Sequence, residues 1–233
     1  IVAHVHCQLG RFREARELAA QAEQRLRSVR PSLFDFFESL HVTGMALLAL
    51  GELHELRARW SAYIPDQLLR GSPMSGVCIR GHGARIMSLL AADDLATARD
   101  VIAEQTQLLE RFPRLGAVML TRTCAEIEYA LYLGQGRRAR QLLADCWSKL
   151  SLPNVLSAAY AQGLRGRTAL AAACALRTVA ERRRLVCSAR AAARALRGLH
   201  RNYAEAPAEL LLASAAKLAD EPERAMQHLQ GAI

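Results

Sequence analysis

The sequence predicts an all-α protein built as a solenoid of helical hairpins, and two observations support this prediction. The first is composition: 52% of the 233 residues are hydrophobic, but only 5% are aromatic. Ala and Leu, which favour helices, dominate the chain, whereas the β-branched and aromatic residues typical of strands are scarce. The second is a short sequence motif that recurs along the whole chain. It consists of the end of one helix, a helix-terminating residue and the start of the next helix. Such a recurrence is typical of stacked helical repeats.

The recurring motif is clearest at residues 9–15, LGRFREA, and returns at 133–139 as LGQGRRA. Weaker copies lie at 93–98 and 220–225, and two Leu residues, one after Gly51 and one in an Arg-rich helix, fill the gaps. The equivalent positions are then Ala15, Leu56, Ala98, Ala139, Leu185 and Ala225. Their separations are 41, 42, 41, 46 and 40 residues, so we expect about six hairpins, the first and last incomplete, with a repeat of roughly 41 residues.

Apolar residues three or four apart, together with Gly and Pro punctuation, place the individual helices. The second helix should bury Phe12, Ala15, Leu18 or Ala19, Ala22 and Leu26. Pro65 should end or kink its helix, and residues 71–73 and 200–206 should form loops. The first expected helix ends near residue 9. The others cover 11–26, 33–50, 52–64, 74–92, 94–112, 115–133, 136–150, 153–176, 180–199, 207–219 and 222 onward.

The chain lacks a segment that could span a bilayer. Its longest uncharged stretch, 150–164, is too short and too polar, and we expect no signal peptide before the first helix. The sequence opens inside an apolar helical pattern without an initiator Met, so we expect a fragment of a longer polypeptide that forms one domain over 1–233. Six cysteines without a CxxC pair indicate small buried residues of a reduced, cytoplasmic protein.

The net charge of +9 is concentrated in one helix, because residues 177–201 contain eight Arg and one Glu and carry +7. The apolar line of this helix is Leu185, Ala189, Ala192, Leu196 and Leu199, with Arg183, Arg190, Arg194, Arg197 and Arg201 on the opposite side. These arginines form either a solvated face or a docking strip for an acidic protein surface or phosphate groups. We expect neither nucleic-acid nor membrane binding, because the helix lacks interleaved aromatic residues and because two of the five residues on its apolar line are small alanines.

Two local patterns imitate chemical sites but lack essential groups. Residues 76–83 have the spacing of a phosphate-binding loop, but His82 replaces its Lys and Gly83 its hydroxyl residue. His4 and Cys7 share a helix face, but no third or fourth metal ligand accompanies them. No Ser/His/Asp or paired-carboxylate grouping follows from local spacing. We therefore expect a non-enzymatic segment without catalytic residues, cofactor or metal.

The motif at Gly10, Phe12, Ala15 and Ala22 resembles the tetratricopeptide repeat (TPR), which implies a right-handed TPR-like solenoid. The longer unit of roughly 41 residues is similar to the TPR-like regions of large bacterial signalling ATPases. Residues 51–60, 89–99 and 129–152 resemble the C-terminal region of bacterial serine/threonine kinase–ATPase fusions. In that family a kinase domain and an ATPase module precede the repeats. None of their catalytic motifs occurs here, so the resemblance implies a regulatory tail.

The expected function is therefore a non-catalytic interaction segment, the sensor or scaffold tail of a cytosolic serine/threonine kinase–ATPase. Its partner would be a protein or other domains of the parent chain, bound along the surface formed by the first helix of each hairpin. Candidate residues there are Arg80, Arg85, Arg122 and Tyr129. The alternative is the inducer-binding repeat domain of an ATP-dependent LuxR-type transcription regulator.

Overall fold

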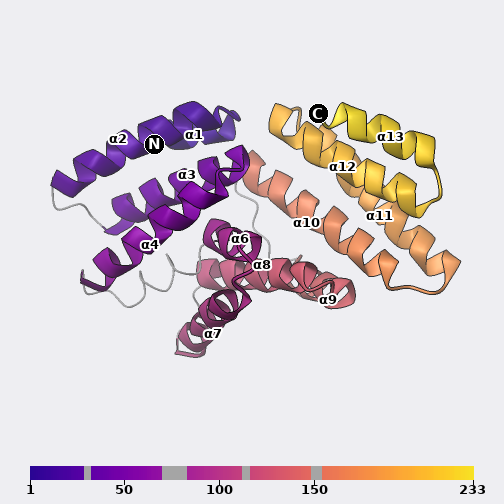
Figure 1. Ribbon diagram of the computed structural model, residues 1–233, viewed down its shortest axis with the longest axis horizontal. Helices are drawn as coiled ribbons and strands as arrows, with labels where there is room; N and C mark the ends of the chain where they lie inside the picture. The colour runs from indigo at the N-terminus through magenta and orange to yellow at the C-terminus, as the bar shows by residue number, and fades with distance from the viewer. Residues whose placement is uncertain (29–32, 70–82, 112–115, 148–153) are drawn as a thin grey trace. The chain divides into compact units, whose positions relative to one another are not determined.

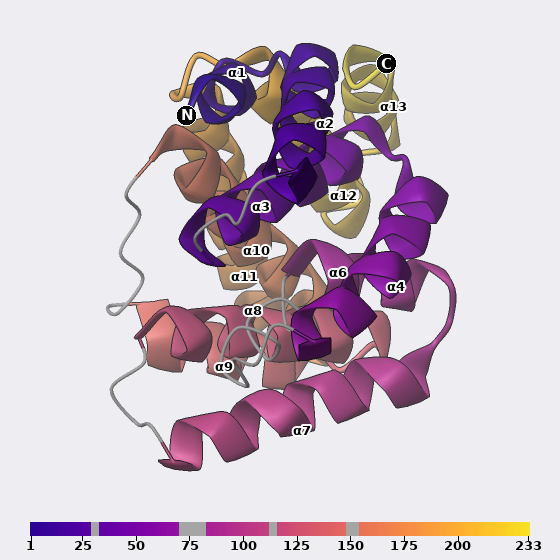
Figure 2. The same ribbon diagram turned by 90° about the vertical axis from the view of Figure 1, so that its left-hand side faces the viewer.

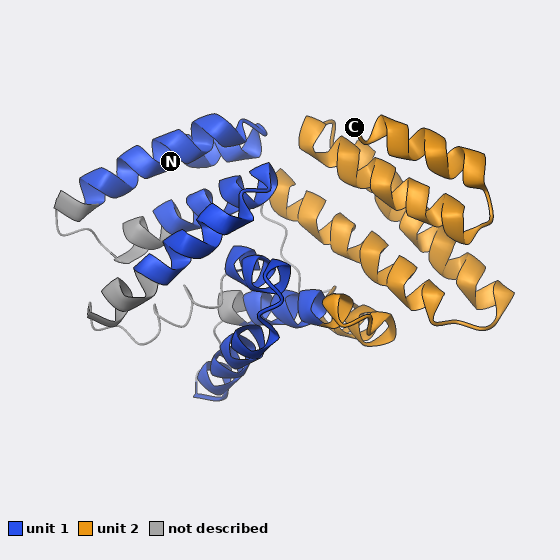
Figure 3. Ribbon diagram, in the orientation of Figure 1, with its two compact units in different colours: residues 1–129 blue, residues 130–233 orange. Residues whose placement is uncertain are grey.

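The computed structural model describes residues 1–28, 33–69, 83–111, 116–147 and 154–233, and within these ranges the protein is all-α, without strands. Helix labels follow Figure 1. The chain divides into two compact units, residues 1–129 and 130–233, with the boundary inside one helix (Figure 3). We describe each unit by itself. The expectation of a single domain over 1–233 stays a prediction.

The first unit is a succession of helices in which neighbours along the chain pack as hairpins. Helices that open successive hairpins also contact one another, as α1 does with α3 and α3 with α6. This pairing of alternate helices is the packing expected of stacked repeats. The helices are α1 (Val2–Gln8), α2 (Phe12–Ser28), α3 (Leu33–Leu50), α4 (Leu53–Leu69), α6 (Gly83–Ala91), α7 (Leu95–Arg111) and α8 (Gly116–Tyr132), which runs past the unit boundary.

The second unit continues the pattern with five helices packed in sequence, and α10 also contacts α12 (Figures 1 and 2). Its largest cluster of buried apolar residues joins α10, α11 and α12. Small residues allow close contacts: a Cβ on Gly136 would lie 2.2 Å from the carbonyl carbon of Ala171. The helices are α9 (Gly136–Trp147), α10 (Val155–Cys174), α11 (Val179–Arg197), α12 (Asn202–Leu218) and α13 (Pro222–Gly231).

Five of the turns between paired helices have the same backbone geometry. In each, one residue adopts a positive φ of 57–77°. Its N–H bonds to the carbonyl three residues earlier, and the next N–H reaches five residues back. This pair of hydrogen bonds is the Schellman arrangement that closes a helix C-terminus. Gly and Asp fit it because both tolerate positive φ better than bulkier residues do. The residues with positive φ are Gly10, Gly51, Asp93, Gly134 and Asp220.

In each of these five hairpins, the predicted repeat position lies five residues after the residue with positive φ. Four such side chains, Ala15, Leu56, Ala98 and Ala139, are completely buried. Ala225 is half-buried. The sixth assignment is displaced, because the connection between α10 and α11 has no residue with positive φ. Counting from the start of α11, the equivalent residue is Arg182 rather than Leu185. The N–H of Arg182 bonds to the carbonyl of Thr178, the residue before the helix.

An ion pair recurs between consecutive hairpins of the first unit. Arg16, one residue after the first repeat position, lies 2.6 Å from Glu52. Arg57, one residue after the second, lies 3.1 Å from Asp94. Both acids directly follow the positive-φ residue of the next hairpin's turn. The recurrence therefore connects each hairpin to its successor through the same pair of positions.

Three expectations about local structure are wrong at least in part, and two others fall outside the described residues. Ala22 is exposed, since the buried side of α2 runs through Ala15, Ala19 and Glu23. The helix α12 begins at Asn202 and contains Pro207, because Ala204 and Ala208 are buried against α11. The helix α4 does not end at Pro65 but continues to Leu69, whereas a kink at Pro65, the other expected effect, stays a prediction. The loop expected at 71–73 and most of the glycine-rich stretch 76–83 lie outside the described residues.

Candidate interaction surfaces

The helix α11 has the two-sided character that the sequence predicts. Ala189, Ala192 and Leu196 are buried, while Leu185 and Leu199 are half-buried. Val186 and Ala193 are buried as well, which widens the apolar side beyond the predicted line. The five arginines of the opposite side are exposed or half-buried. We call them the α11 strip: Arg183, Arg190, Arg194, Arg197 and Arg201.

Two members of the α11 strip form ion pairs inside the second unit. The Arg190 guanidinium lies 2.8 Å from the carboxylate of Glu221, the residue before α13, which also accepts a bond from Arg224. The hydrogen bond from Arg190 lowers the pKa of Glu221 below its ordinary value. Arg190 therefore links α11 to the N-cap residue of α13.

Arg197 forms the second internal pair, with Glu209 of α12. Nδ1 of His228, from α13, lies 2.8 Å from the other carboxylate oxygen of Glu209. Burial raises the pKa of Glu209, but the hydrogen bonds from Arg197 and His228 outweigh burial, and the pKa lies below its ordinary value. One carboxylate thus connects three helices.

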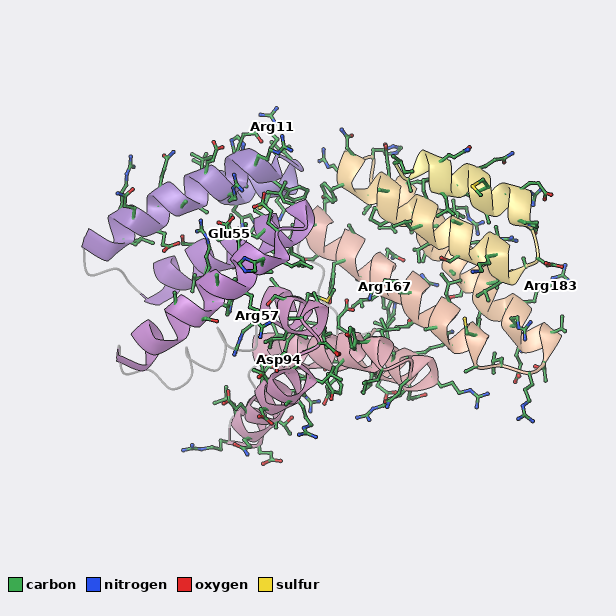
Figure 4. The ribbon with its side chains drawn as sticks, in the orientation of Figure 1. Arg11, Glu55, Arg57, Asp94, Arg167 and Arg183 are labelled. Atoms are coloured by element: carbon green, nitrogen blue, oxygen red, sulfur yellow. The ribbon has the colours of Figure 1, made fainter. Side chains whose placement is uncertain are left out.

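The other exposed arginines of α11 form no ion pair with an acidic side chain among the described residues. Arg183 and Arg194 are exposed and form no ion pair with a described residue, as is also true of the adjacent Arg184. Arg183 projects outward from α11 in Figure 4. Together with Val179 and Cys187, Arg183 and Arg184 line an open depression at the start of α11. Val179 is 76% exposed, so a cationic surface adjoins an apolar one.

The second set of candidate residues, expected on the first helices of the hairpins, does not form one surface. Arg80 lies outside the described residues. Arg85 of α6 is buried, with 8% of its surface exposed. Arg122 of α8 contacts Glu126 at 3.5 Å and the hydroxyl of Thr106 at 3.4 Å. Tyr129 packs against an apolar cluster of α6 and α7. A partner-binding role for either set of residues stays a prediction.

Arg85 instead lines a polar cavity of about 120 Å³ between α4, α6 and α7. Arg57 and Asp94, which form an ion pair at 3.1 Å, both belong to its lining, and Figure 4 labels the two residues. The sequence analysis missed this site, although the separation of 37 residues between Arg57 and Asp94 nearly equals that of 36 between Arg16 and Glu52. Among the described residues, those that line the cavity are Arg57, Trp60, Ser61, Arg85, Ser88, Leu89, Asp94 and Thr97.

The cysteines and histidines near the N-terminus pack rather than gather into a site. Cys7 is buried, its thiol faces the carbonyl oxygen of Val42 at 3.8 Å, and burial raises the pKa of the thiol to about 11. The ring of His4 stacks on that of His41. Among the described residues no group of three or more His, Cys, Asp or Glu could hold a metal ion. Cys174 and Cys187 are exposed, so the expectation of buried cysteines is wrong for these two.

Comparison with protein-family models, curated proteins and solved structures gives no match. In the part of the chain that the structure describes, none of the helices combines the length and apolar character needed to cross a membrane.

Proposed function

We propose that this chain is a non-catalytic protein-interaction segment, the sensor or scaffold tail of a cytosolic serine/threonine kinase–ATPase. The sequence resemblance supports the parent class. The observation that carries the interaction role is the exposed cationic surface at the start of α11, formed by Arg183, Arg184 and Val179. The structure distinguishes these arginines from Arg190 and Arg197, which are engaged within the unit.

The chemistry of this surface supports a partner with acidic side chains. Exposed guanidinium groups bind carboxylates through paired hydrogen bonds, and the adjacent Val179 offers an apolar contact. A matching surface carries Asp or Glu beside a small apolar side chain. We propose that it belongs to another domain of the parent chain or to a separate cytosolic protein.

The coding sequence that flanks the chain tests the parent class directly. A protein-kinase domain followed by an ATPase module upstream supports the proposal. A helix-turn-helix domain downstream supports the alternative, an inducer-binding domain of a LuxR-type transcription regulator, which the polar cavity in the first unit also favours. A flanking sequence with neither arrangement contradicts both.

The interaction surface is tested by charge reversal in the full chain. Arg183→Glu, Arg184→Glu and Arg194→Glu together should weaken binding of the upstream domains, measured by calorimetry, by about tenfold or more, since a charge-assisted hydrogen bond contributes roughly 1.5–3 kcal/mol. The matched control reverses three exposed arginines elsewhere: Arg11, Arg99 and Arg138. Equal loss of binding in both triple variants would contradict the assignment to α11, because it would indicate a general charge effect.

A further inference from the structure

We propose that the cavity between α4, α6 and α7 binds a single tetrahedral oxyanion, either free phosphate or the phosphate group of a small ester. This inference is independent of the interaction role proposed for α11. The cavity has a volume of about 120 Å³, which is enough for roughly four water molecules at about 30 Å³ each. That space suits one phosphate group with a water or two.

The charge of the lining favours an anion. The described lining residues include two guanidinium groups, of Arg57 and Arg85, and one carboxylate, of Asp94. Arg85 is more than nine-tenths buried and keeps its charge at any physiological pH. Arg85 also has a further interaction. A guanidinium has five N–H donors, so it can keep that partner and still donate into the cavity.

The lining of the cavity includes an internal competitor for the anion. Nη2 of Arg57 lies 3.1 Å from Oδ2 of Asp94, and the Arg57 side chain is 46% exposed. The other oxygen of Asp94 accepts the backbone N–H of Thr97 and so caps the start of α7. An entering phosphate would take over Arg57 from Asp94, because a dianion attracts the guanidinium more strongly than a monoanion does.

The hydroxyl groups of the lining differ in what they can donate. Ser61 donates to the carbonyl of Arg57, and Ser88 donates to the carbonyl of Arg85. The Thr97 hydroxyl forms no hydrogen bond with a described residue. Thr97 is therefore the hydroxyl that we assign to the anion, beside Arg57 and Arg85.

The test is a phosphate titration of the whole chain, followed by the fluorescence of Trp60, which lines the cavity. The chain has two Trp residues, and Trp147→Phe leaves Trp60 as the sole reporter. We expect saturable binding at millimolar phosphate under constant ionic strength. Titration with O-phosphoserine distinguishes the source: binding comparable to that of phosphate indicates an ester ligand, and binding of phosphate alone indicates the free ion.

Two variants give opposite results if the assignment is right. Arg57→Gln should weaken phosphate binding by about tenfold or more, because it removes a charged donor. Asp94→Asn keeps a side chain that caps α7 but removes the competing charge, so binding should tighten by several-fold. Both residues are partly exposed, so the fold should tolerate these changes. Arg99→Gln, an exposed arginine of α7 outside the lining, is the control and should change nothing.

Three results would overturn the proposal: no saturable response at millimolar phosphate, equal affinity of wild type and Arg57→Gln, or weaker binding by Asp94→Asn. Calorimetry on the same proteins checks that the fluorescence change reports binding. A circular-dichroism melt confirms that each variant is folded.

Discussion

Arg190 and Glu221, 31 residues apart in the sequence, lie 2.8 Å apart in the structure and join the middle of α11 to the residue that precedes α13. The helix α13 contains no buried residue. Its attachment therefore depends strongly on polar contacts, of which this pair and the Glu209–His228 contact are the clearest.

Arg190→Gln should accelerate amide hydrogen exchange across residues 222–231, because it removes a charged contact from a helix with little apolar burial. Hydrogen exchange followed by mass spectrometry measures this effect. Arg194→Gln, four residues further along α11, is the matched control and should leave α13 unchanged, since Arg194 is exposed and forms no ion pair with a described residue. Equal acceleration in both variants would contradict a specific role for the Arg190–Glu221 pair.

The stability of the second unit should decrease at acidic pH. The pKa values of Glu209 and Glu221 both lie below the ordinary value of 4.5. Carboxylates of this kind stabilise the fold above their unfolded-state pKa, and the contribution is lost as the pH falls through the lowered native pKa. Urea midpoints measured from neutral pH down to about pH 3, below the reference carboxylate pKa, should fall most steeply below that reference value. Glu221→Gln should have a shallower acid dependence than the wild type, and an unchanged slope would exclude Glu221 as a contributor.

Gly136→Ala should destabilise the second unit by about 1–3 kcal/mol, because the new Cβ would collide with the backbone of Ala171 at 2.2 Å. Gly163→Ala is the control, since a Cβ there meets no atom within 4 Å. In a helix interior this change should stabilise by about 0.5–1 kcal/mol. The free energies of unfolding, obtained from urea titrations, should therefore shift in opposite directions. Shifts of the same sign would argue against the close approach of α9 to α10.

Ala139→Arg should cost on the order of 3 kcal/mol or more, because Ala139 is completely buried and a guanidinium there would be unpaired or would push the helices apart. The neighbouring Arg138 is exposed, and Arg138→Ala should change the free energy of unfolding by no more than about 0.5 kcal/mol. Similar denaturation midpoints for both variants would refute the register of this hairpin.

The arginine-rich helix should not make the protein a specific nucleic-acid binder. Two of its arginines already pair with internal acids, and the strip contains no aromatic residue for base stacking. Mobility shifts with duplex and single-stranded DNA at physiological salt should show binding no tighter than the non-specific range of about 10⁻⁴–10⁻⁶ M. Submicromolar affinity would reverse this prediction.

The helical content and most turns were predictable because their signals are local. Gly10, Gly51 and Gly134 mark turns that need a positive φ, and Asp93 and Asp220 substitute for Gly at equivalent positions. The helix α3 has the predicted bounds, 33–50. The connection after α10 lacks such a residue, and the sequence pattern therefore placed its repeat position three residues late, at Leu185 instead of Arg182.

The candidate sites were less predictable because they depend on the rotational phase of two or three helices. The sequence placed the arginines on the correct side of α11, but it could not show that Glu209 and Glu221 engage Arg197 and Arg190. The cavity lined by Arg57 was missed for the same reason. Only comparison of Arg57 with Arg16, at equivalent repeat positions, could have indicated the pairing of Arg57 with Asp94.

The repeated turn has a consequence for how the chain reaches its native state. Each of the five turns is closed by backbone hydrogen bonds between residues three and five positions apart. A hairpin can therefore begin to form without waiting for distant parts of the chain, and the entropy lost in closing it is small. Proteins dominated by such short-range contacts fold quickly, and arrays of similar units can begin folding at more than one place. We expect refolding to start at more than one hairpin rather than along a single route from one obligatory nucleus.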